Sequence, residues 1–135
     1  MTAGMLTESL VCIPGSGEWL AGGVIAYLTR VKRELLGVTE ERVISRGAAI
    51  EMAAGVARLL RTDVGISTTG SAGPETMEGQ PVGATWVGVA VGERRYAEFR
   101  VFGGDAAAIR AQAVCLACDV ARQAILTERS SAPTT

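Results

Sequence analysis

The sequence contains no histidine. That absence excludes the Ser-His-Asp triad, the Cys-His pair and every metal site that uses an imidazole ligand. A general base in this chain is therefore a lysine, a carboxylate or a tyrosine. The three cysteines are an odd number, and the N-terminus lacks the pattern of a secretory signal, which argues against a disulfide framework. A cytoplasmic protein is the expectation.

The chain also has little net charge and few aromatic side chains. A formal net charge of −1 gives no basic field for nucleic acid or an anionic membrane surface. The longest uncharged apolar stretch, residues 19–28, is too short to span a bilayer. The chain is instead rich in alanine, valine, leucine and glycine, which suits tight packing of helices on a sheet. Its 135 residues are enough for one domain with a buried core.

Hydrophobic periodicity and turn residues predict helices that alternate with strands. The predicted helices are 4–12, 29–36, 39–45, 50–61 and a long helix that Asp105 caps and that runs to about Leu126. The predicted strands are 19–27, 63–69, 84–91 and 94–102, the last two joined by a Gly92-Glu93 hairpin turn. This order predicts a three-layer α/β/α domain over 1–126, with a mixed sheet covered by helices on both faces. The small polar tail 127–135 is predicted to be disordered.

Tyr27 and Lys32 are the candidate catalytic residues. Tyr27 ends a predicted buried strand and Lys32 lies in the following helix, so both can project at the carboxyl end of the sheet, where open α/β folds bind ligands. A lysine desolvated there has a lowered pKa and can act as a base. The alternative is a tyrosine at an interface and a solvated helix lysine.

Two glycine-containing turns are candidate anion sites. The loop Thr69-Gly70-Ser71-Ala72-Gly73-Pro74 follows a predicted strand, so its backbone N–H groups can hold an anion or a developing oxyanion. It is neither a P-loop nor a dinucleotide fingerprint, and the alternative is an ordinary long connection. Thr2-Ala3-Gly4 at a helix start can cradle a phosphate, and a plain helix cap is its alternative.

Short motifs follow one another along nearly the whole chain, from Thr2 to about Ala124. They are IPGSG (13–17), GGVIAY (22–27) with Lys32, LLGV (35–38), GISTTGSAGP (65–74), PVGATW (81–86), FGGD (102–105) and Ile109-Arg110. No single segment is decisive, but their order and spacing together are specific. In this set the chain resembles the C-terminal domain of the CinA family, the competence/damage-inducible group that includes nicotinamide mononucleotide deamidases.

The resemblance implies hydrolysis of the carboxamide of nicotinamide mononucleotide to the nicotinate nucleotide and ammonia, without a metal or cofactor, in pyridine nucleotide salvage. In the family a serine in a Glu-Ser-x-Thr-Gly-Gly turn is the nucleophile, helped by a tyrosine and a lysine that match Tyr27 and Lys32. The substrate-binding residues it implies are Thr2, Ala3, Gly4, Thr69, Gly70, Gly73, Pro74 and Arg110. The implied partners are a small-molecule nucleotide and further copies of the chain, with neither nucleic acid nor membrane.

The sequence departs from the family pattern at the turn of the nucleophile. Thr2, Ala3 and Gly4 match Thr-Gly-Gly, so the serine position falls one residue before Met1. The helix and strand that lead into it in the family would also precede Met1, so the expected sheet lacks its first strand. Ala106 stands where the family has an arginine. The readings left open are an amidohydrolase that begins further upstream, a non-catalytic nucleotide-binding or interaction module, and a marginally stable remnant.

Overall fold

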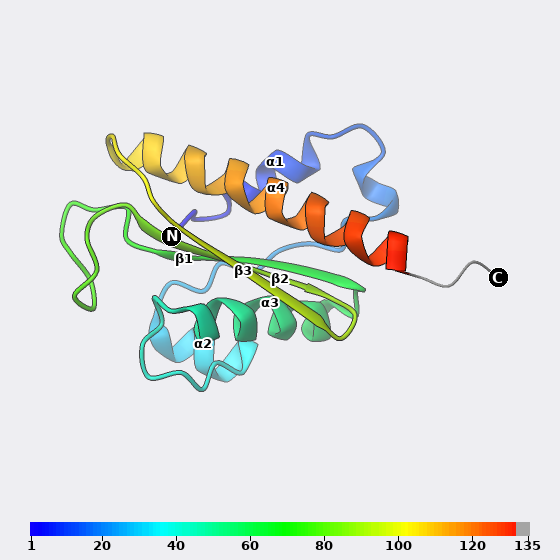
Figure 1. Ribbon diagram of the computed structural model, residues 1–135, viewed down its shortest axis with the longest axis horizontal. Helices are drawn as coiled ribbons and strands as arrows, with labels where there is room; N and C mark the ends of the chain where they lie inside the picture. The colour runs from blue at the N-terminus through cyan, green and yellow to red at the C-terminus, as the bar shows by residue number, and fades with distance from the viewer. Residues whose placement is uncertain (132–135) are drawn as a thin grey trace.

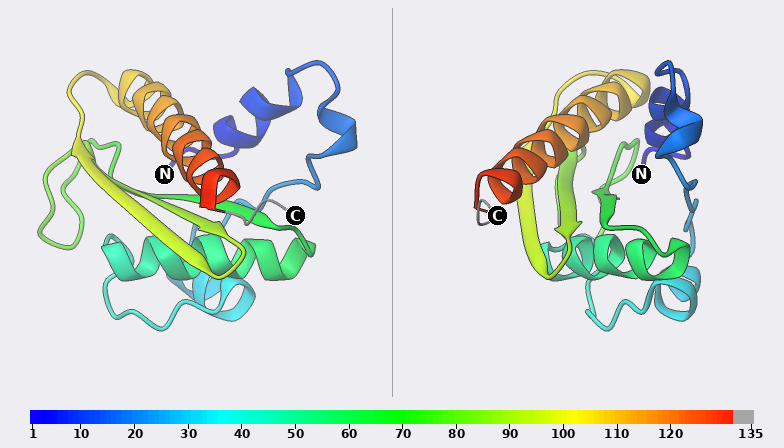
Figure 2. Two further views of the ribbon diagram at one scale, coloured as in Figure 1. Left: turned by 45° about the vertical axis from the view of Figure 1, so that its right-hand side comes forward. Right: turned by 90° about the vertical axis from the view of Figure 1, so that its right-hand side faces the viewer.

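The computed structural model describes residues 1–131, and its helices lie in two layers on opposite faces of one sheet (Figure 1). One layer holds α1 and α4, and the other holds α2 and α3 (Figure 2). The elements are α1 (Met5–Val11), η1 (Ser16–Glu18), α2 (Thr29–Leu36), α3 (Arg46–Leu60), β1 (Val64–Gly70), β2 (Ala84–Val91), β3 (Arg94–Val101) and α4 (Ala106–Ser131). The predicted three-layer α/β/α class is confirmed.

The sheet has three strands in the order β1-β2-β3, and both pairs are antiparallel. The predicted hairpin is present: β2 and β3 are joined at Gly92-Glu93, and Gly92 has a φ of 52°. The predicted mixed sheet is antiparallel throughout the described residues, and the predicted strand at 19–27 is absent. Residues 19–27 join no ladder with any other described residue. They line the same cavity as β1 and form no backbone hydrogen bond with it.

Two helix predictions need correction. Residues 39–45 are irregular, because the backbone N–H and hydroxyl of Thr39 donate to the carboxylate of Glu51 at 2.8 and 2.5 Å instead of capping a helix. Ser45 is the N-cap of α3 and accepts from the Ala48 N–H at 3.0 Å, so α3 begins before the predicted residue 50. Asp105 caps α4 as predicted, accepting from the Ala108 N–H at 2.8 Å.

The C-terminal end of α4 also differs from the prediction. The helix continues to Ser131, so residues 127–131 of the predicted tail are helical. Buried alanines at 113, 117, 121 and 124 give α4 an apolar stripe that packs on Val87 and Val89 of β2. The remaining residues of that predicted tail, 132–135, lie outside the described residues.

Helix α3 lies unusually close to the sheet because glycine occupies two strand positions beneath it. A Cβ at Gly65 would lie 2.0 Å from the Ala53 carbonyl oxygen, and one at Gly88 would lie 2.1 Å from that of Ala49. The buried hydroxyl of Ser67 donates to the same Ala49 carbonyl at 2.6 Å. Backbone contact and a side-chain hydrogen bond thus fix α3 on β1 and β2.

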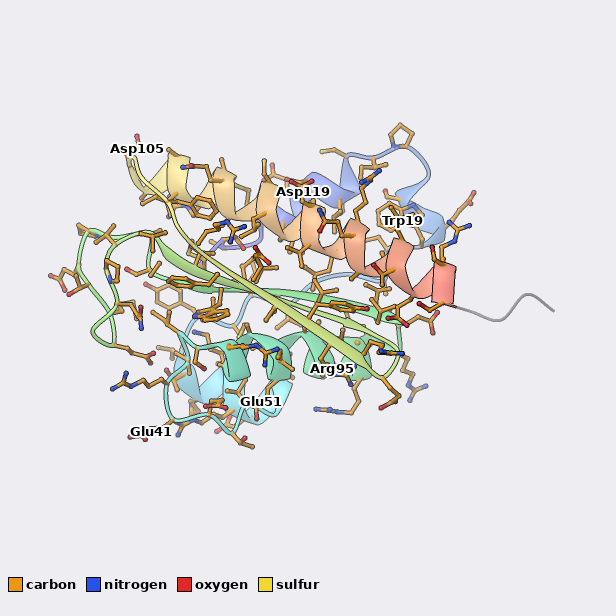
Figure 3. All side chains as sticks on the ribbon, in the orientation of Figure 1. Trp19, Glu41, Glu51, Arg95, Asp105 and Asp119 are labelled. Atoms are coloured by element: carbon orange, nitrogen blue, oxygen red, sulfur yellow. The ribbon has the colours of Figure 1, made fainter. Side chains whose placement is uncertain are left out.

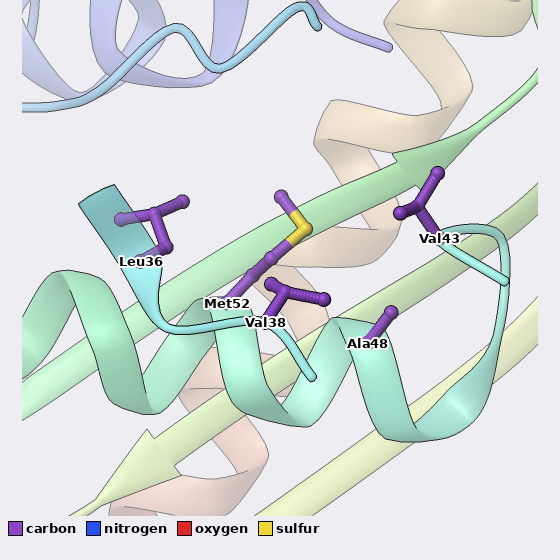
Figure 4. Packing of buried hydrophobic residues seen from close by; sticks show 5 residues of the cluster. All are labelled: Leu36, Val38, Val43, Ala48 and Met52. Carbon is purple, nitrogen blue, oxygen red and sulfur yellow. The ribbon is translucent and has the colours of Figure 1, made fainter. Parts of the chain in front are cut away.

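Helix α2 packs on the outer side of α3. Leu36, Val38, Val43, Ala48 and Met52 form the apolar cluster between them (Figure 4). A Cβ at Gly55 would lie 2.0 Å from the backbone carbonyl oxygen of Leu36, so the two helices touch through their backbones. This contact fixes the position of α2 and of the side chains that it carries.

We predict opposite effects from two glycine-to-alanine substitutions in α3. Alanine raises helix propensity by about 1 kcal/mol at either position. At Gly55 the new methyl group meets the fixed Leu36 backbone, so Gly55→Ala is expected to lower the free energy of unfolding by about 2 kcal/mol. At Gly47 the methyl group meets only the flexible side chain of exposed Glu40, so Gly47→Ala is expected to be neutral or stabilising.

Chemical denaturation of the two variants and the parent protein measures these changes. Equal stabilisation by both substitutions would contradict the close contact between α2 and α3.

Candidate functional site

Lys32 is a half-buried cation on α2. Burial lowers the pKa of its ammonium group below the ordinary value, and the negative charge of the Glu78 carboxylate partly offsets that shift. The unfolded chain binds this proton more readily, so burial of the charged Lys32 ammonium group lowers the free energy of unfolding. This loss of stability is fully present below the lowered pKa, and it is relieved as the pH rises from the lowered pKa to the ordinary one. A lysine in this state gives up its proton more easily than an exposed lysine does.

Glu78 ties the loop between β1 and β2 to the segment that leads into α3. Its carboxylate accepts hydrogen bonds from the N–H groups of Val43 and Ile44, at 3.0 and 2.8 Å. Glu78 and Gly79 have positive φ values of 54° and 74°, which makes them the tip of a tight turn. Sequence reasoning missed Glu78. The Glu-Gly dipeptide in a long loop is the signal that could have indicated a turn with a fixed acidic side chain.

A second cation, Arg110, comes from α4 on the other side of the sheet. Burial lowers the pKa of the Met1 amine, and the positive charges of Lys32 and Arg110 lower it further. Both side chains therefore contribute positive potential at the start of the chain, and positive potential favours an anion.

The predicted turn at Thr2, Ala3 and Gly4 is present and is conformationally unusual. Ala3 and Gly4 have φ values of 52° and 92°, and Gly4 is the N-cap of α1. Thr2 is buried, and its hydroxyl shares a hydrogen bond of 3.0 Å with the hydroxyl of Thr68 on β1. This bond holds the turn against the C-terminal half of β1.

The side chain of Tyr27 is 83% exposed, and no hydrogen bond joins it to Lys32 within residues 1–131. Tyr27 lies at the end of the unpaired segment 19–27 and lines the same cavity as the turn at Thr2. Lys32 and Arg110 both act electrostatically on the Met1 amine, whereas Tyr27 lines the cavity.

The residues of the predicted loop 69–74 differ in whether their polar groups already have partners within the protein. Thr69 is 1% exposed, and its hydroxyl donates to the Val43 carbonyl at 2.5 Å, so it serves packing between β1 and the start of α3. Gly70 closely approaches the backbone of β2, since a Cβ at this position would lie 2.2 Å from the Ala84 carbonyl oxygen. Gly73 has a φ of 87°, and Pro74 is exposed. The loop is thus a fixed structure with an exposed tip.

A cavity of about 1030 Å³ lies between residues 1–27 and the edge of the sheet. Apolar side chains of α1, α3 and α4 contribute to its wall, and the rest comes from the N-terminal segment and β1. Within residues 1–131 no group of three or more acidic or cysteine side chains gathers in a way that could hold a metal ion. Over the same range no helix is long and apolar enough to cross a membrane.

A family model described as the CinA C-terminal domain matches residues 1–125. A Bacillus pumilus protein named as competence-damage inducible is 40% identical over 119 residues, which cover 84% of this chain and 29% of that protein. A Desulforamulus reducens protein with the same name is 39% identical, over 90% of this chain and 31% of that protein. The chain therefore spans less than a third of the length of these two relatives.

Solved structures agree with these sequence matches. Competence damage-inducible protein A of Klebsiella pneumoniae superposes with a TM-score of 0.84 at 27% identity, over 98% of this chain and 83% of that chain. A CinA superfamily protein of Escherichia coli gives a TM-score of 0.81 at 29% identity, over 86% of this chain and 71% of that chain.

We predict that Glu78→Gln lowers the pKa of Lys32 further. The glutamine oxygen can still accept a backbone hydrogen bond, but the negative charge that favours the ammonium form is gone. The rate at which acetic anhydride modifies Lys32, followed by peptide mass spectrometry across a pH series, reports this pKa. Its midpoint should move to lower pH in Glu78→Gln and stay in place in Glu75→Gln, a charge removal on the same loop. An unmoved midpoint in Glu78→Gln would show that the two groups are not coupled.

Proposed function

The chain belongs to the CinA C-terminal domain family, and on that premise we propose that it is an amidohydrolase domain of pyridine nucleotide salvage. The proposed reaction is hydrolysis of the carboxamide of nicotinamide mononucleotide to nicotinate mononucleotide and ammonia. The observation that carries the proposal is the half-buried Lys32 with its lowered pKa, whose positive charge, like that of Arg110, acts on the Met1 amine beside the turn of Thr2 to Gly4. In a chain without histidine, such a lysine is the best available base.

In the proposed mechanism, Lys32 in its neutral form takes the proton from the hydroxyl of the family serine. The serine oxygen attacks the carboxamide carbon, and the negative charge that develops on the carbonyl oxygen needs nearby N–H donors. Collapse of the tetrahedral intermediate breaks the carbon–nitrogen bond, and the proton held by Lys32 goes to the departing ammonia. Water then attacks the ester, Lys32 takes a proton from that water, and the serine is regenerated with the carboxylate product.

The remaining residues are proposed to bind rather than to react. Arg110 supplies positive charge for the phosphate of the nucleotide. The turn of Thr2, Ala3 and Gly4 and the loop of Thr69, Gly70, Gly73 and Pro74 offer backbone groups for the phosphate or the oxyanion. Tyr27 lies at the cavity rim, where a tyrosine can position the pyridine ring of a ligand.

Several broader properties belong to the same proposal. We infer that residues 1–126 act as one domain, in the cytoplasm, where the nucleotide is made and used. Exposed apolar side chains on the N-terminal segment, among them Trp19 (Figure 3), Ile25 and Leu28, favour association of several copies.

A non-catalytic nucleotide-binding module is the second candidate. The positive charge that Lys32 and Arg110 each contribute at the Met1 amine supports it independently of a nucleophile, because positive charge attracts a phosphate whether or not the carboxamide is hydrolysed. It predicts saturable binding of nicotinamide mononucleotide by calorimetry and no release of ammonia.

We predict that Lys32→Met abolishes ammonia release from nicotinamide mononucleotide. Methionine keeps the apolar stem and removes the base, so kcat should fall by about 10³-fold or more while the protein stays folded. The test uses the protein as its own cell makes it, with the intact mass recorded first. Arg33→Met on the same helix is the matched control, since Arg33 is exposed and its guanidinium donates to the Glu41 carbonyl at 3.4 Å.

Wild-type turnover in Lys32→Met would overturn the assignment of the base. Binding of the nucleotide without turnover in the parent protein would favour the non-catalytic module over the amidohydrolase.

A further inference from the structure

Strand β3 is an edge of the sheet, on the side away from the N-terminal segment (Figure 2). A bond of 3.0 Å from the Phe102 N–H to the Gly83 carbonyl continues its ladder with β2 and sets the alternation of backbone groups. Even-numbered residues of β3 turn their N–H and carbonyl groups toward β2, so Ala97, Phe99 and Val101 turn theirs outward. Within residues 1–131, no backbone group bonds to this outer edge.

Helix α4 covers the first half of β3 and leaves the second half open on the same face. The Tyr96 hydroxyl donates to the Glu128 carboxylate of α4, which places the even-numbered side chains of β3 on this face. Further along the strand, Arg100 is exposed and forms an ion pair of 2.5 Å with Glu98. Its guanidinium also donates to the outward carbonyl of Phe99 at 2.8 Å, and that carbonyl has a second lone pair for strand pairing.

The odd-numbered side chains of β3 form an apolar row on the opposite face, which is the face of α3. Ala97 pairs with Gly88, the residue of β2 that lies beneath α3. Phe99 packs on Trp86 of β2 with ring centroids 5.0 Å apart, and Val101 is 53% exposed. The open edge of β3 therefore has charges on one face and apolar side chains on the other.

A second copy of β3 fits this edge in an antiparallel register centred on Phe99. Two strands related by a two-fold axis pair so that a residue before the centre lies opposite one after it. With Phe99 opposite its own copy, Ala97 lies opposite Val101 and Glu98 lies opposite Arg100, each pair occurring twice. The outward backbone groups of the odd-numbered residues then meet one another, as antiparallel hydrogen bonds require. Opposite charges directly across two strands stabilise the pairing.

Neighbouring registers are unfavourable. A shift of the second copy by two residues places either two Glu98 or two Arg100 side chains opposite each other, and like charges in that position are destabilising. A shift by one residue sets outward backbone groups against residues whose own groups already bond to β2. Charges on an edge strand ordinarily prevent pairing with other strands. A register that matches them favours a second copy of this chain over a strand of another protein.

We propose that β3 is the interface of a homodimer, in which the three-stranded sheets of two copies join into one continuous antiparallel sheet. Residues 97–101 of each copy pair, so the interface is small and the dimer dissociates reversibly. The edge lies opposite to residues 1–27 and their cavity. The proposal therefore rests neither on the amidohydrolase reaction nor on the exposed apolar side chains of the N-terminal segment.

Charge reversal in the full-length protein tests the register. Glu98→Arg sets positive charges opposite positive charges, and Arg100→Glu sets negative opposite negative, so each should raise the dissociation constant of the dimer at least about tenfold. An equimolar mixture of the two variants should recover the affinity of the parent protein, because the mixed dimer again opposes positive with negative. Neither chain in that mixture regains its own ion pair, so the recovery reports contact between copies alone.

Sedimentation velocity over a concentration series measures the assembly, and thermal unfolding of each variant verifies that it is folded. Arg95→Glu is the matched control. Arg95 is an exposed cation on the same strand, but it lies outside the paired residues 97–101, so its reversal should leave the dissociation constant unchanged.

Hydrogen exchange locates the interface. The amide protons of Phe99 and Val101 should exchange quickly in dilute monomer and become protected in the dimer. Those of Glu98 and Arg100 bond to β2, so they should be protected in both states.

Three results would overturn the proposal. They are a parent protein that stays monomeric at every concentration, a variant mixture that associates no better than either variant alone, and a dimer in which the amides of Phe99 and Val101 remain unprotected. None of these measurements depends on ammonia release, so failure of this interface and failure of the proposed reaction are distinguishable.

Discussion

The structure depends on how closely α3 approaches the sheet. Glycine at positions 65 and 88 lets the carbonyl groups of Ala53 and Ala49 lie directly on β1 and β2, where a Cβ would collide with them. The hydroxyls of Ser67 and Thr69 then use the carbonyl oxygens of Ala49 and Val43, so no buried side-chain polar atom in the described residues lacks a partner. Helix α3, the segment that leads into it and strand β1 therefore form one rigid unit.

This unit positions the side chains that we propose for catalysis. Because α2 touches α3 through Gly55 and Leu36, Lys32 has a fixed position with part of its surface out of water. Glu78 reaches the same unit through the N–H groups of Val43 and Ile44, so its carboxylate is held at a constant place in the field of Lys32. A base in a partly dry position, with its charge balanced by a fixed acid, is an arrangement suited to proton transfer.

The sequence predicts the elements whose signals are local. The bounds of α2, the hairpin at Gly92-Glu93 and the Asp105 cap follow from capping and turn residues and are confirmed. Residues 19–27 have strand composition, but a strand also needs a neighbour, and composition does not supply one. Thr39 resembles a helix cap in the sequence, whereas its actual partner, Glu51, is brought to it only by the tertiary fold. The electrostatic effect of Glu78 on Lys32 likewise depends on packing between distant segments, which no spacing in the sequence encodes.

The central claim is that the region around Lys32 binds the carboxamide of a pyridine nucleotide. A crystal structure of the protein with nicotinamide mononucleotide tests it most directly. The account predicts the carboxamide group within hydrogen-bonding distance of the Lys32 Nζ atom, with the phosphate in contact with Arg110 or with the backbone of the glycine-containing turns. A nucleotide bound elsewhere on the surface, with Lys32 in contact with water alone, would contradict it.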